Sequence, residues 1–156
     1  MDIVYRSIDP GNYQEAYAFN LFWEYSWRDS SAAYIADSED ERRAKTEGLI
    51  ANLSRADRKY HCLAAFVDGE MAGVISLDRM SIDKRPACHV QGLWVHPDHR
   101  GRGIARRLKQ LSEDWAREMG SEFMDSNVRV DNPNMIALNE QLGYEVARLN
   151  FRKALR

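Results

Sequence analysis

The stretch VHPDHRGRGIARRL, residues 95–108, places two glycines and four arginines between two different periodic patterns. The apolar run before it, residues 87–95, predicts a strand, and apolar residues at helical spacing predict a helix over 103–120. The first N–H groups of such a helix lack intrahelical partners, and the helix dipole adds positive charge there. Because Gly101 and Gly103 carry no Cβ, an anion can approach these amides. The stretch predicts an anion-binding turn, although a glycine turn before a solvated helix explains the glycines equally well.

The spacing of this turn differs from the two common nucleotide-binding motifs. The chain has no G-x-x-x-x-G-K-[ST] sequence, and its G-x-G lacks both the third glycine and an acidic residue about 20 positions further on. These differences disfavour a P-loop nucleotide triphosphatase and a Rossmann dehydrogenase.

The remaining sequence predicts a mixed sheet flanked by helices. Asn12 is positioned as a helix N-cap, and Ser38 with Glu41 has capping-box spacing. Asp68 and Gly69 predict a tight hairpin turn. The predicted order is β-α-α-β-β-β-α-β-α-β, an α/β (α+β) arrangement. The expected strands cover 2–8, 61–67, 71–80, 87–95 and 121–130, with a last strand or hairpin at 144–155. The expected helices cover 13–21, 39–55, 103–120 and 132–143, with a loop at 28–38.

The composition and charge limit the classes of protein to which the chain can belong. A chain of 156 residues with 44% hydrophobic residues predicts one domain over residues 1–156. The net charge of -2 divides into -5 for residues 1–80 and +3 for residues 81–156, too little positive charge for a nucleic-acid partner. With no apolar window of membrane-spanning length and no signal-like N-terminus, we expect a cytoplasmic protein without membrane association. Cys62 and Cys88 lie in apolar runs without metal-ligand spacing, which predicts core residues and no metal site.

Two segments carry a family resemblance. Residues 92–108, GLWVHPDHRGRGIARRL, resemble the acetyl-CoA-binding motif of the GNAT superfamily of N-acetyltransferases, in which a strand, V-x-P-x-x-R-G-x-G-[IV]-[GA] and a helix follow one another. Residues 130–145, VDNPNMIALNEQLGYE, resemble the later N-x-x-A-x-x-L-Y-x-x-x-G-F pattern. The resemblance implies a mixed sheet of six or seven strands with about four helices, splayed between strands 4 and 5, with acetyl-CoA as cosubstrate in the splay.

The resemblance also assigns the cofactor-binding residues. In this family the strand before the turn pairs through its backbone with the pantetheine arm, here Leu93, Trp94 and Val95. The turn and the first helical residues wrap the pyrophosphate, here Arg100, Gly101, Arg102, Gly103, Ile104 and Ala105. Asn132 matches an asparagine that lies near the pantetheine in relatives, and a helix N-cap explains it equally well.

Two residues are candidates for the base that removes the amine proton. Relatives place a glutamate at one of two positions that here hold His89 and Gln91, and period-two alternation puts both on one face with Leu93. Glutamine cannot act as a base, whereas a histidine can. A half-buried strand histidine bonded to a neighbour is the plainer interpretation of His89. Glu24, in the aromatic segment FWEYSW, is the second candidate.

The usual acid for the leaving thiolate is missing. Its tyrosine position in the family motif holds Asn139, which cannot donate a catalytic proton but could hydrogen-bond the sulfur or an amide of coenzyme A. The oxyanion donor is expected to be a backbone N–H near Leu93 or Trp94, and Gly92 is compatible with a strand bulge there.

The sequence therefore predicts an acetyl-CoA-dependent N-acetyltransferase, an acyltransferase of class EC 2.3.1, in which a primary amine attacks directly within a ternary complex. The acidic first half favours a small cationic amine, and a peptide amine remains open. A weaker resemblance points to aminoglycoside 6'-N-acetyltransferases. The alternative is a non-catalytic coenzyme A-binding sensor or scaffold of the same fold, and a homodimer is left open.

Overall fold

The computed structural model describes residues 2–156, which divide into two compact units. The first unit ends at Ser126 and contains β1 (Ile3–Ser7), α1 (Tyr13–Ser30), α2 (Glu39–Leu53), β2 (Tyr60–Val67), β3 (Glu70–Ile82), β4 (Arg85–Val95), the 3-10 helix η1 (Pro97–His99), α3 (Ile104–Glu118) and β5 (Phe123–Ser126). The second unit, Asn127–Arg156, contains α4 (Pro133–Gln141).

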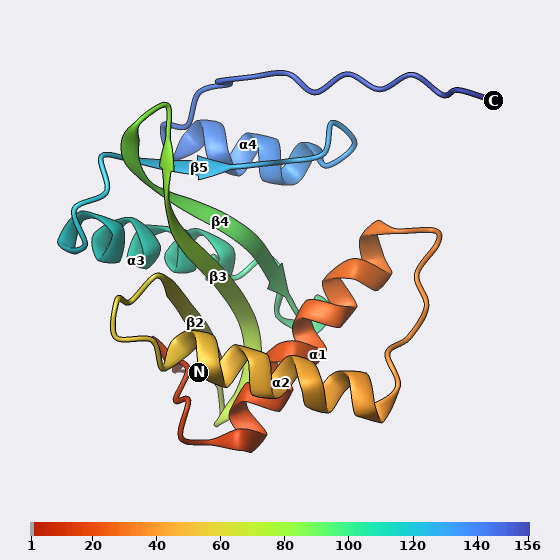
Figure 1. Ribbon diagram of the computed structural model, residues 1–156, viewed down its shortest axis with the longest axis vertical. Helices are drawn as coiled ribbons and strands as arrows, with labels where there is room; N and C mark the ends of the chain where they lie inside the picture. Colours follow the sequence, from red (N-terminus) through yellow and green to blue (C-terminus); the bar gives the residue numbers. More distant parts are fainter. Residues whose placement is uncertain (1) are drawn as a thin grey trace. The chain divides into compact units, whose positions relative to one another are not determined.

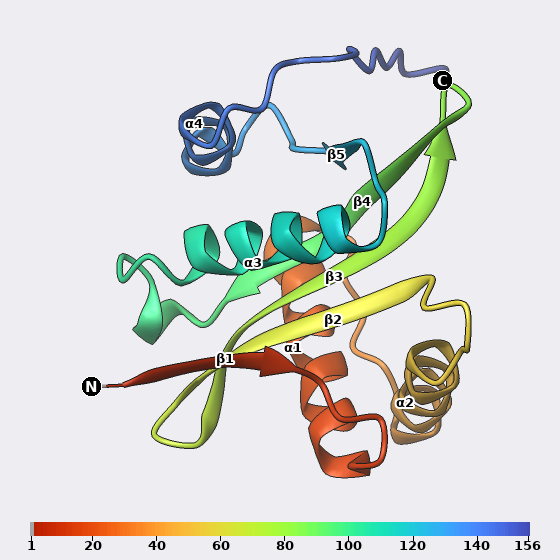
Figure 2. The same cartoon turned by 90° about the vertical axis from the view of Figure 1, so that its left-hand side faces the viewer.

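The first unit is built on one mixed sheet in the order β1-β2-β3-β4-β5. The first four strands pair antiparallel, and β4 pairs parallel with β5. Figure 2 shows how β3 and β4 run alongside each other with a strong twist. At the β2–β3 turn, Asp68 and Gly69 have φ angles of 52° and 84°, which is the tight hairpin that the sequence predicts.

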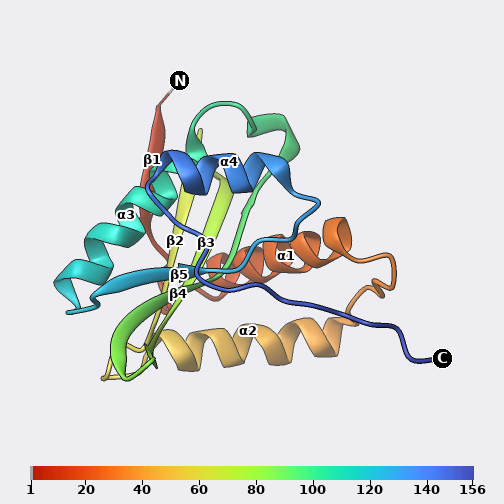
Figure 3. The ribbon, with the colours of Figure 1, turned by 90° about the horizontal axis from the view of Figure 1, so that it is seen from above.

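Helices cover both faces of this sheet (Figures 1 and 3). The core under α3 contains Leu77, Cys88 and Leu108, whereas the core under α1 and α2 contains Phe19 and Cys62. Figure 3 shows α1 and α2 side by side on the face opposite α3. The two cysteines are therefore core residues, as predicted, one on each side of the sheet.

Local signals set the helix starts. The side chain of Asn12 accepts a hydrogen bond from the Glu15 amide, and both bonds of the Ser38–Glu41 capping box are present. Helix α1 extends to Ser30, nine residues beyond the predicted end, because its aromatic residues pack against the sheet and hold the extra turns.

The predicted number of strands is wrong: the sheet has five strands among residues 2–156 instead of six or seven. Residues 144–155, predicted as a strand or hairpin, form no regular structure. The segment has the alternating apolar pattern of a strand. A strand also needs a neighbouring strand to form hydrogen bonds with its backbone, and this segment pairs with none in the described chain. Its large apolar side chains are 73% to 88% exposed, namely Val146, Leu149, Phe151 and Leu155.

Candidate functional site

The sheet opens between β4 and β5. Their parallel pairing is limited to Ala87–Val90 of β4 against Phe123–Ser126 of β5. Beyond Val90, β4 continues to Val95 and pairs with β3 alone among the strands of residues 2–156. The predicted splay between strands 4 and 5 is therefore confirmed, and the edge of residues 91–95 that faces away from β3 is available to a ligand that pairs like a strand.

A bulge lies where the splay begins. Ser76 of β3 is opposite Gly92, and the next residue, Leu77, is opposite Val90, so Gln91 is the extra residue of β4. The bulge shifts the alternation of side chains by one position. Leu93 consequently packs against the core under α3, and the prediction that it shares a face with Gln91 is wrong.

The turn after β4 has the geometry of an anion-binding site. Gly101 and Gly103 have φ angles of 75° and 78°, which glycine adopts without strain. Gly103 is the N-cap of α3 and makes no side-chain capping bond, so the first amides of α3 stay uncapped by a side chain. A Cβ built at either glycine meets no atom within 4 Å, which shows open space in front of the turn.

Arg100 holds this turn against the end of β4. Its Nε donates to the Val95 carbonyl at 2.9 Å, and its guanidinium lies 5.7 Å from the centre of the Trp94 ring. The Trp94 indole in turn donates to Asp29 of α1 at 2.8 Å. Ile104, the first residue of α3, is buried against Gly73 of β3. A Cβ on Gly73 would lie 2.9 Å from the Ile104 side chain.

The aromatic segment of α1 divides into two groups. Phe22 and Tyr25 pack against Trp94 at ring distances of 5.1 and 5.7 Å and belong to the core. Trp23 and Trp27, on another face of the helix, line a cavity instead. The aromatic segment therefore contributes one pair of residues to the core and another pair to the wall of the cavity.

The cavity has a volume of about 650 Å³ and lies between α1, the loop 31–38, α2 and the bulge of β4. Ser76 and Gln91 line it from the sheet, where the Ser76 hydroxyl donates to the Gln91 Oε1 at 3.1 Å. Trp23 lies directly on β4, since a Cβ at Gly92 would be 2.3 Å from its ring. The volume is in the range of pockets that bind small molecules.

Glu24 lines this cavity, and other groups already bind its carboxylate. Its side chain is 5% exposed and pairs with Arg42 at 3.0 Å. The Tyr34 hydroxyl and the Asp37 amide also donate to it. The hydrogen bond from Arg42 is the main cause that lowers the pKa of Glu24 to about 2. Such a carboxylate is a weak proton acceptor at neutral pH, and its interactions fix the loop between α1 and α2.

His89 forms a close pair with Asp125. The register of β4 and β5 places these residues opposite each other, and the histidine Nδ1 lies 2.6 Å from a carboxylate oxygen of Asp125. Both side chains are about four-fifths buried. A carboxylate at Nδ1 favours the tautomer that leaves Nε2 as a proton acceptor. Because Cys88 and Val90 point into the core under α3, His89 lies on the opposite face, which is that of Gln91.

Asn132 and Asn139 lie in the second unit. The side chain of Asn132 accepts from the Met135 amide at 3.2 Å and caps α4, which is the structural interpretation of this residue. Asn139 is buried, and its Oδ1 has no hydrogen-bond partner in the described part of the chain.

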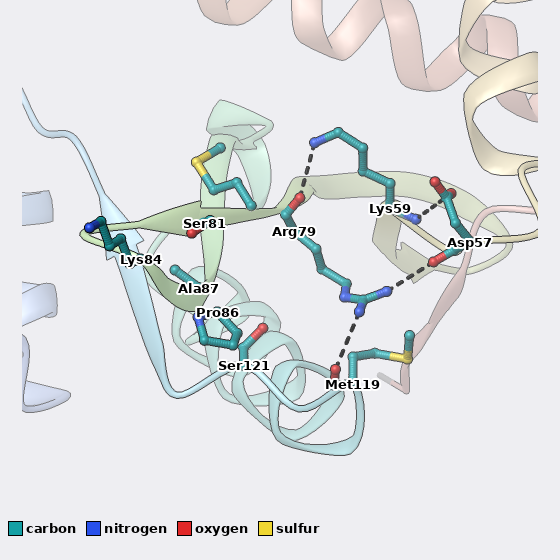
Figure 4. Close-up of a pocket in the computed structure, with 10 residues that line it drawn as sticks. Asp57, Lys59, Arg79, Ser81, Lys84, Pro86, Ala87, Met119 and Ser121 are labelled. Atoms are coloured by element: carbon teal, nitrogen blue, oxygen red, sulfur yellow. Dashed lines mark hydrogen bonds between the residues drawn. The ribbon is translucent and has the colours of Figure 1, made fainter.

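A second hollow of about 450 Å³ lies toward the β3–β4 hairpin (Figure 4). Arg79 spans it and donates to the carbonyls of Asp57 and Met119, while Lys59 donates to the Arg79 carbonyl. These cations bind the chain itself, so we assign the hollow a structural role. Within residues 2–156, no group of three or more His, Cys, Asp or Glu side chains could hold a metal, and no helix is long and apolar enough to cross a membrane.

The splayed sheet and the glycine turn define the class of fold that the sequence resemblance implies. A sequence model of the acetyltransferase (GNAT) family matches residues 11–144. The chain therefore belongs to the GNAT acetyltransferase family.

Curated relatives match parts of the chain. An uncharacterized N-acetyltransferase of Methanocaldococcus jannaschii is 30% identical over 82 residues, which cover 51% of this chain and 36% of that protein. The L-amino acid N-acyltransferase MnaT of Escherichia coli is 31% identical over 88 residues, or 56% of this chain and 51% of that protein. The chain thus matches between a third and a half of the length of these relatives.

Solved structures match the whole fold. The aminoglycoside N-acetyltransferase AAC(6')-Iy in complex with CoA aligns with a TM-score of 0.76 over 98% of this chain and 95% of that chain, at 19% identity. An aminoglycoside acetyltransferase from an uncultured soil metagenomic sample, in complex with sisomicin, has a TM-score of 0.75 over 99% and 97% of the two chains, at 11% identity. At these identities the likeness establishes the fold.

Several residues of the site carry no clear signal in the sequence. Asp125 was part of a predicted strand, and only its parallel register brings it to His89. Tyr34 and Arg42 fix Glu24 through contacts ten and eighteen positions along the chain. A charged residue inside a short apolar strand, as in FMDS, is the signal that could have identified Asp125.

Proposed function

We propose that this chain transfers the acetyl group of acetyl-CoA to a primary amine by direct attack in a ternary complex. One arrangement carries the proposal: the unpaired edge of β4 leads into an open glycine turn at the start of α3, and a cavity of small-molecule size adjoins the same strand. The reaction requires three parts of the protein: a strand edge that pairs with the pantetheine arm, a turn that binds phosphate, and a cavity for the acceptor.

The donor side uses backbone groups. Leu93, Trp94 and Val95 would pair with the amides of the pantetheine arm, and the amides from Gly101 to Ala105 would bind the pyrophosphate. The open space at Gly101 and Gly103 fits a phosphate oxygen. Arg100 positions the turn through the Val95 carbonyl, and Arg102 adds positive charge beside it. Acetyl-CoA supplies the activated thioester when bound.

The acceptor side needs a group that takes up the amine proton. We assign this role to His89, whose Nε2 accepts the proton while Asp125 stabilises the resulting imidazolium. His89 does not itself line the cavity and lies two residues along β4 from Gln91, so we propose that a water carries the amine proton to its ring. Backbone N–H groups near the Gln91 bulge would donate to the thioester oxygen as negative charge develops.

The leaving sulfur has no tyrosine acid at the family position. We propose that the thiolate leaves without a side-chain acid, because Asn139 stands at the family's tyrosine position. Asn132 caps α4, and this structural role explains the asparagine without a contact to a ligand.

The experiment measures release of coenzyme A, with a thiol reagent, from acetyl-CoA and a panel of primary amines. His89→Gln should lower kcat by about a hundredfold or more and remove the acidic limb of the pH profile. Asp125→Asn should lower kcat less, since the ring stays in place with a disturbed tautomer. The Kd of acetyl-CoA, measured by calorimetry, should stay unchanged in both variants.

Two outcomes would oppose parts of this proposal. Unchanged kinetics in His89→Gln would exclude this residue as the base. Tight acetyl-CoA binding with no turnover of any amine would favour the sensor or scaffold that the sequence leaves open.

A further inference from the structure

The acceptor cavity has an aromatic wall with an exposed apolar mouth. Trp23 and Tyr34 line its interior, and Trp27 and Ile35 line it while remaining 59% and 86% exposed. Large side chains so exposed to water are stabilised when a ligand covers them. The wall is therefore suited to a ligand with an apolar surface of its own.

The acidic groups of the cavity already have cationic partners. Arg42 pairs with Glu24 at 3.0 Å, and Lys45 pairs with Asp37 at 2.6 Å. Glu24 additionally accepts from Tyr34 and from a backbone amide. A polycationic acceptor would have to replace these partners, and breaking a pair around a nearly buried carboxylate is costly. Both carboxylates that line the cavity are thus already engaged by cations of the chain, and Arg42 also pairs with Glu39 outside it at 3.0 Å.

Trp23 gives the cavity a flat boundary beside the reacting strand. Its ring rests on the backbone of Gly92, where any Cβ would overlap it, next to the bulged Gln91. The side chain of Gln91 is held by the Ser76 hydroxyl. A planar ligand that stacks on Trp23 would consequently carry its amine toward β4.

From these observations we propose that the acceptor is a monoamine on a flat apolar body, of the arylalkylamine type, and not a polycation. The inference rests on the proposed acetyl transfer and names its substrate class. The indole rings bind the apolar body, and the single amine faces the bulge of β4, where its nitrogen attacks the thioester carbon. The C–S bond breaks, the thiolate leaves, and the amine proton passes to His89.

Gly48 provides a variant that tests the cavity without endangering the fold. It lies on an exposed turn of α2, lines the cavity, and would carry a Cβ with no atom within 4 Å. Leucine and alanine both favour helix over glycine by up to about 1 kcal/mol. Gly48→Leu should fill part of the cavity, and Gly48→Ala is the matched control that leaves most of it open.

The test compares 2-phenylethylamine with spermidine and kanamycin as acceptors, at low and high salt. We expect kcat/KM for 2-phenylethylamine to exceed that for either polycation at least tenfold at both salt concentrations. Gly48→Leu should lower this value at least tenfold and Gly48→Ala much less, because alanine occupies less of the cavity, and the Kd of acetyl-CoA should be unchanged in both. Binding of 2-phenylethylamine, followed by tryptophan fluorescence, should be saturable and be lost in Gly48→Leu.

The possible failures are distinguishable. Faster turnover of spermidine or kanamycin would overturn the substrate class and leave the acetyl transfer standing. Saturable binding of 2-phenylethylamine without turnover of any amine would support the ligand class and contradict the proposed transfer. Absence of both binding and turnover of 2-phenylethylamine would overturn the inference.

Discussion

Replacing Gly103 is expected to have two separable effects, one on the stability of the fold and one on the binding of acetyl-CoA. Its φ of 78° costs a residue with a Cβ about 1 kcal/mol in the folded state. A Cβ in front of the first α3 amides should also remove about one hydrogen bond to a phosphate, or about 1 kcal/mol of binding. Gly103→Ala should therefore lower affinity about fivefold.

Aspartate at the same position adds charge repulsion. Two phosphate charges about 5 Å from a carboxylate oppose it by roughly 1.7 kcal/mol even at the dielectric constant of water. Gly103→Asp should accordingly raise the Kd of acetyl-CoA about a hundredfold, as measured by calorimetry.

Gly120→Ala is the matched control. Gly120 has a φ of 82° and open surroundings like those of Gly103, but it follows the C-terminal end of α3, away from the proposed phosphate site. Both alanine variants should lower Tm by about 2–4 °C, and only Gly103→Ala should change the Kd. Equal affinities for acetyl-CoA in Gly103→Asp and the wild type would refute the phosphate-binding role of the turn.

Three further predictions concern stability, reactivity and exposure. The pKa of Glu24 is lowered to about 2 in the fold, so ionised Glu24 stabilises the protein by an amount on the order of 2 kcal/mol after solvent screening. This contribution is present above the unfolded pKa of the carboxyl and is lost as pH falls from about 4.5 toward 2. Chemical denaturation across this pH range should show the loss in the wild type and not in Glu24→Gln, and parallel curves would contradict it. Burial raises the pKa of Cys62 and of Cys88 to about 12, so a thiol reagent should label neither in the native protein and both after denaturation; native labelling would show an open core. Trypsin should cleave first at Arg148, Arg152 and Lys153, in the exposed segment without regular structure, as followed by mass spectrometry; resistance there would indicate that a second copy covers it.

Local signals made much of the fold predictable. The strand, glycine turn and helix around residues 87–119 follow from periodicity and from the special conformation of glycine. The caps at Asn12 and Ser38 follow from side chains that bond amides three residues away. In each case the residues that interact are close in sequence, so the pattern itself contains the interaction.

The parts that escaped prediction depend on residues far apart in the chain. The bulge at Gln91 is a property of the β3–β4 register, and it moves Leu93 to the other face. The contact between His89 and Asp125 requires the parallel register of β4 and β5. The predicted strand at 144–155 has the right alternation but finds no ladder to join. Alternation predicts which residues can form a strand and leaves its partner undetermined.

Hydrogen exchange with and without acetyl-CoA reports directly on the proposed cosubstrate site, since backbone amides make its contacts. If the open edge of β4 and the glycine turn hold the cosubstrate, acetyl-CoA should slow exchange at residues 92–95 and 101–106, where pantetheine and pyrophosphate would bond. The exposed hairpin around Asp83, at the other end of β3 and β4, should be unaffected. Unchanged exchange at both segments under saturating acetyl-CoA would show that the cosubstrate does not bind along β4 and the glycine turn.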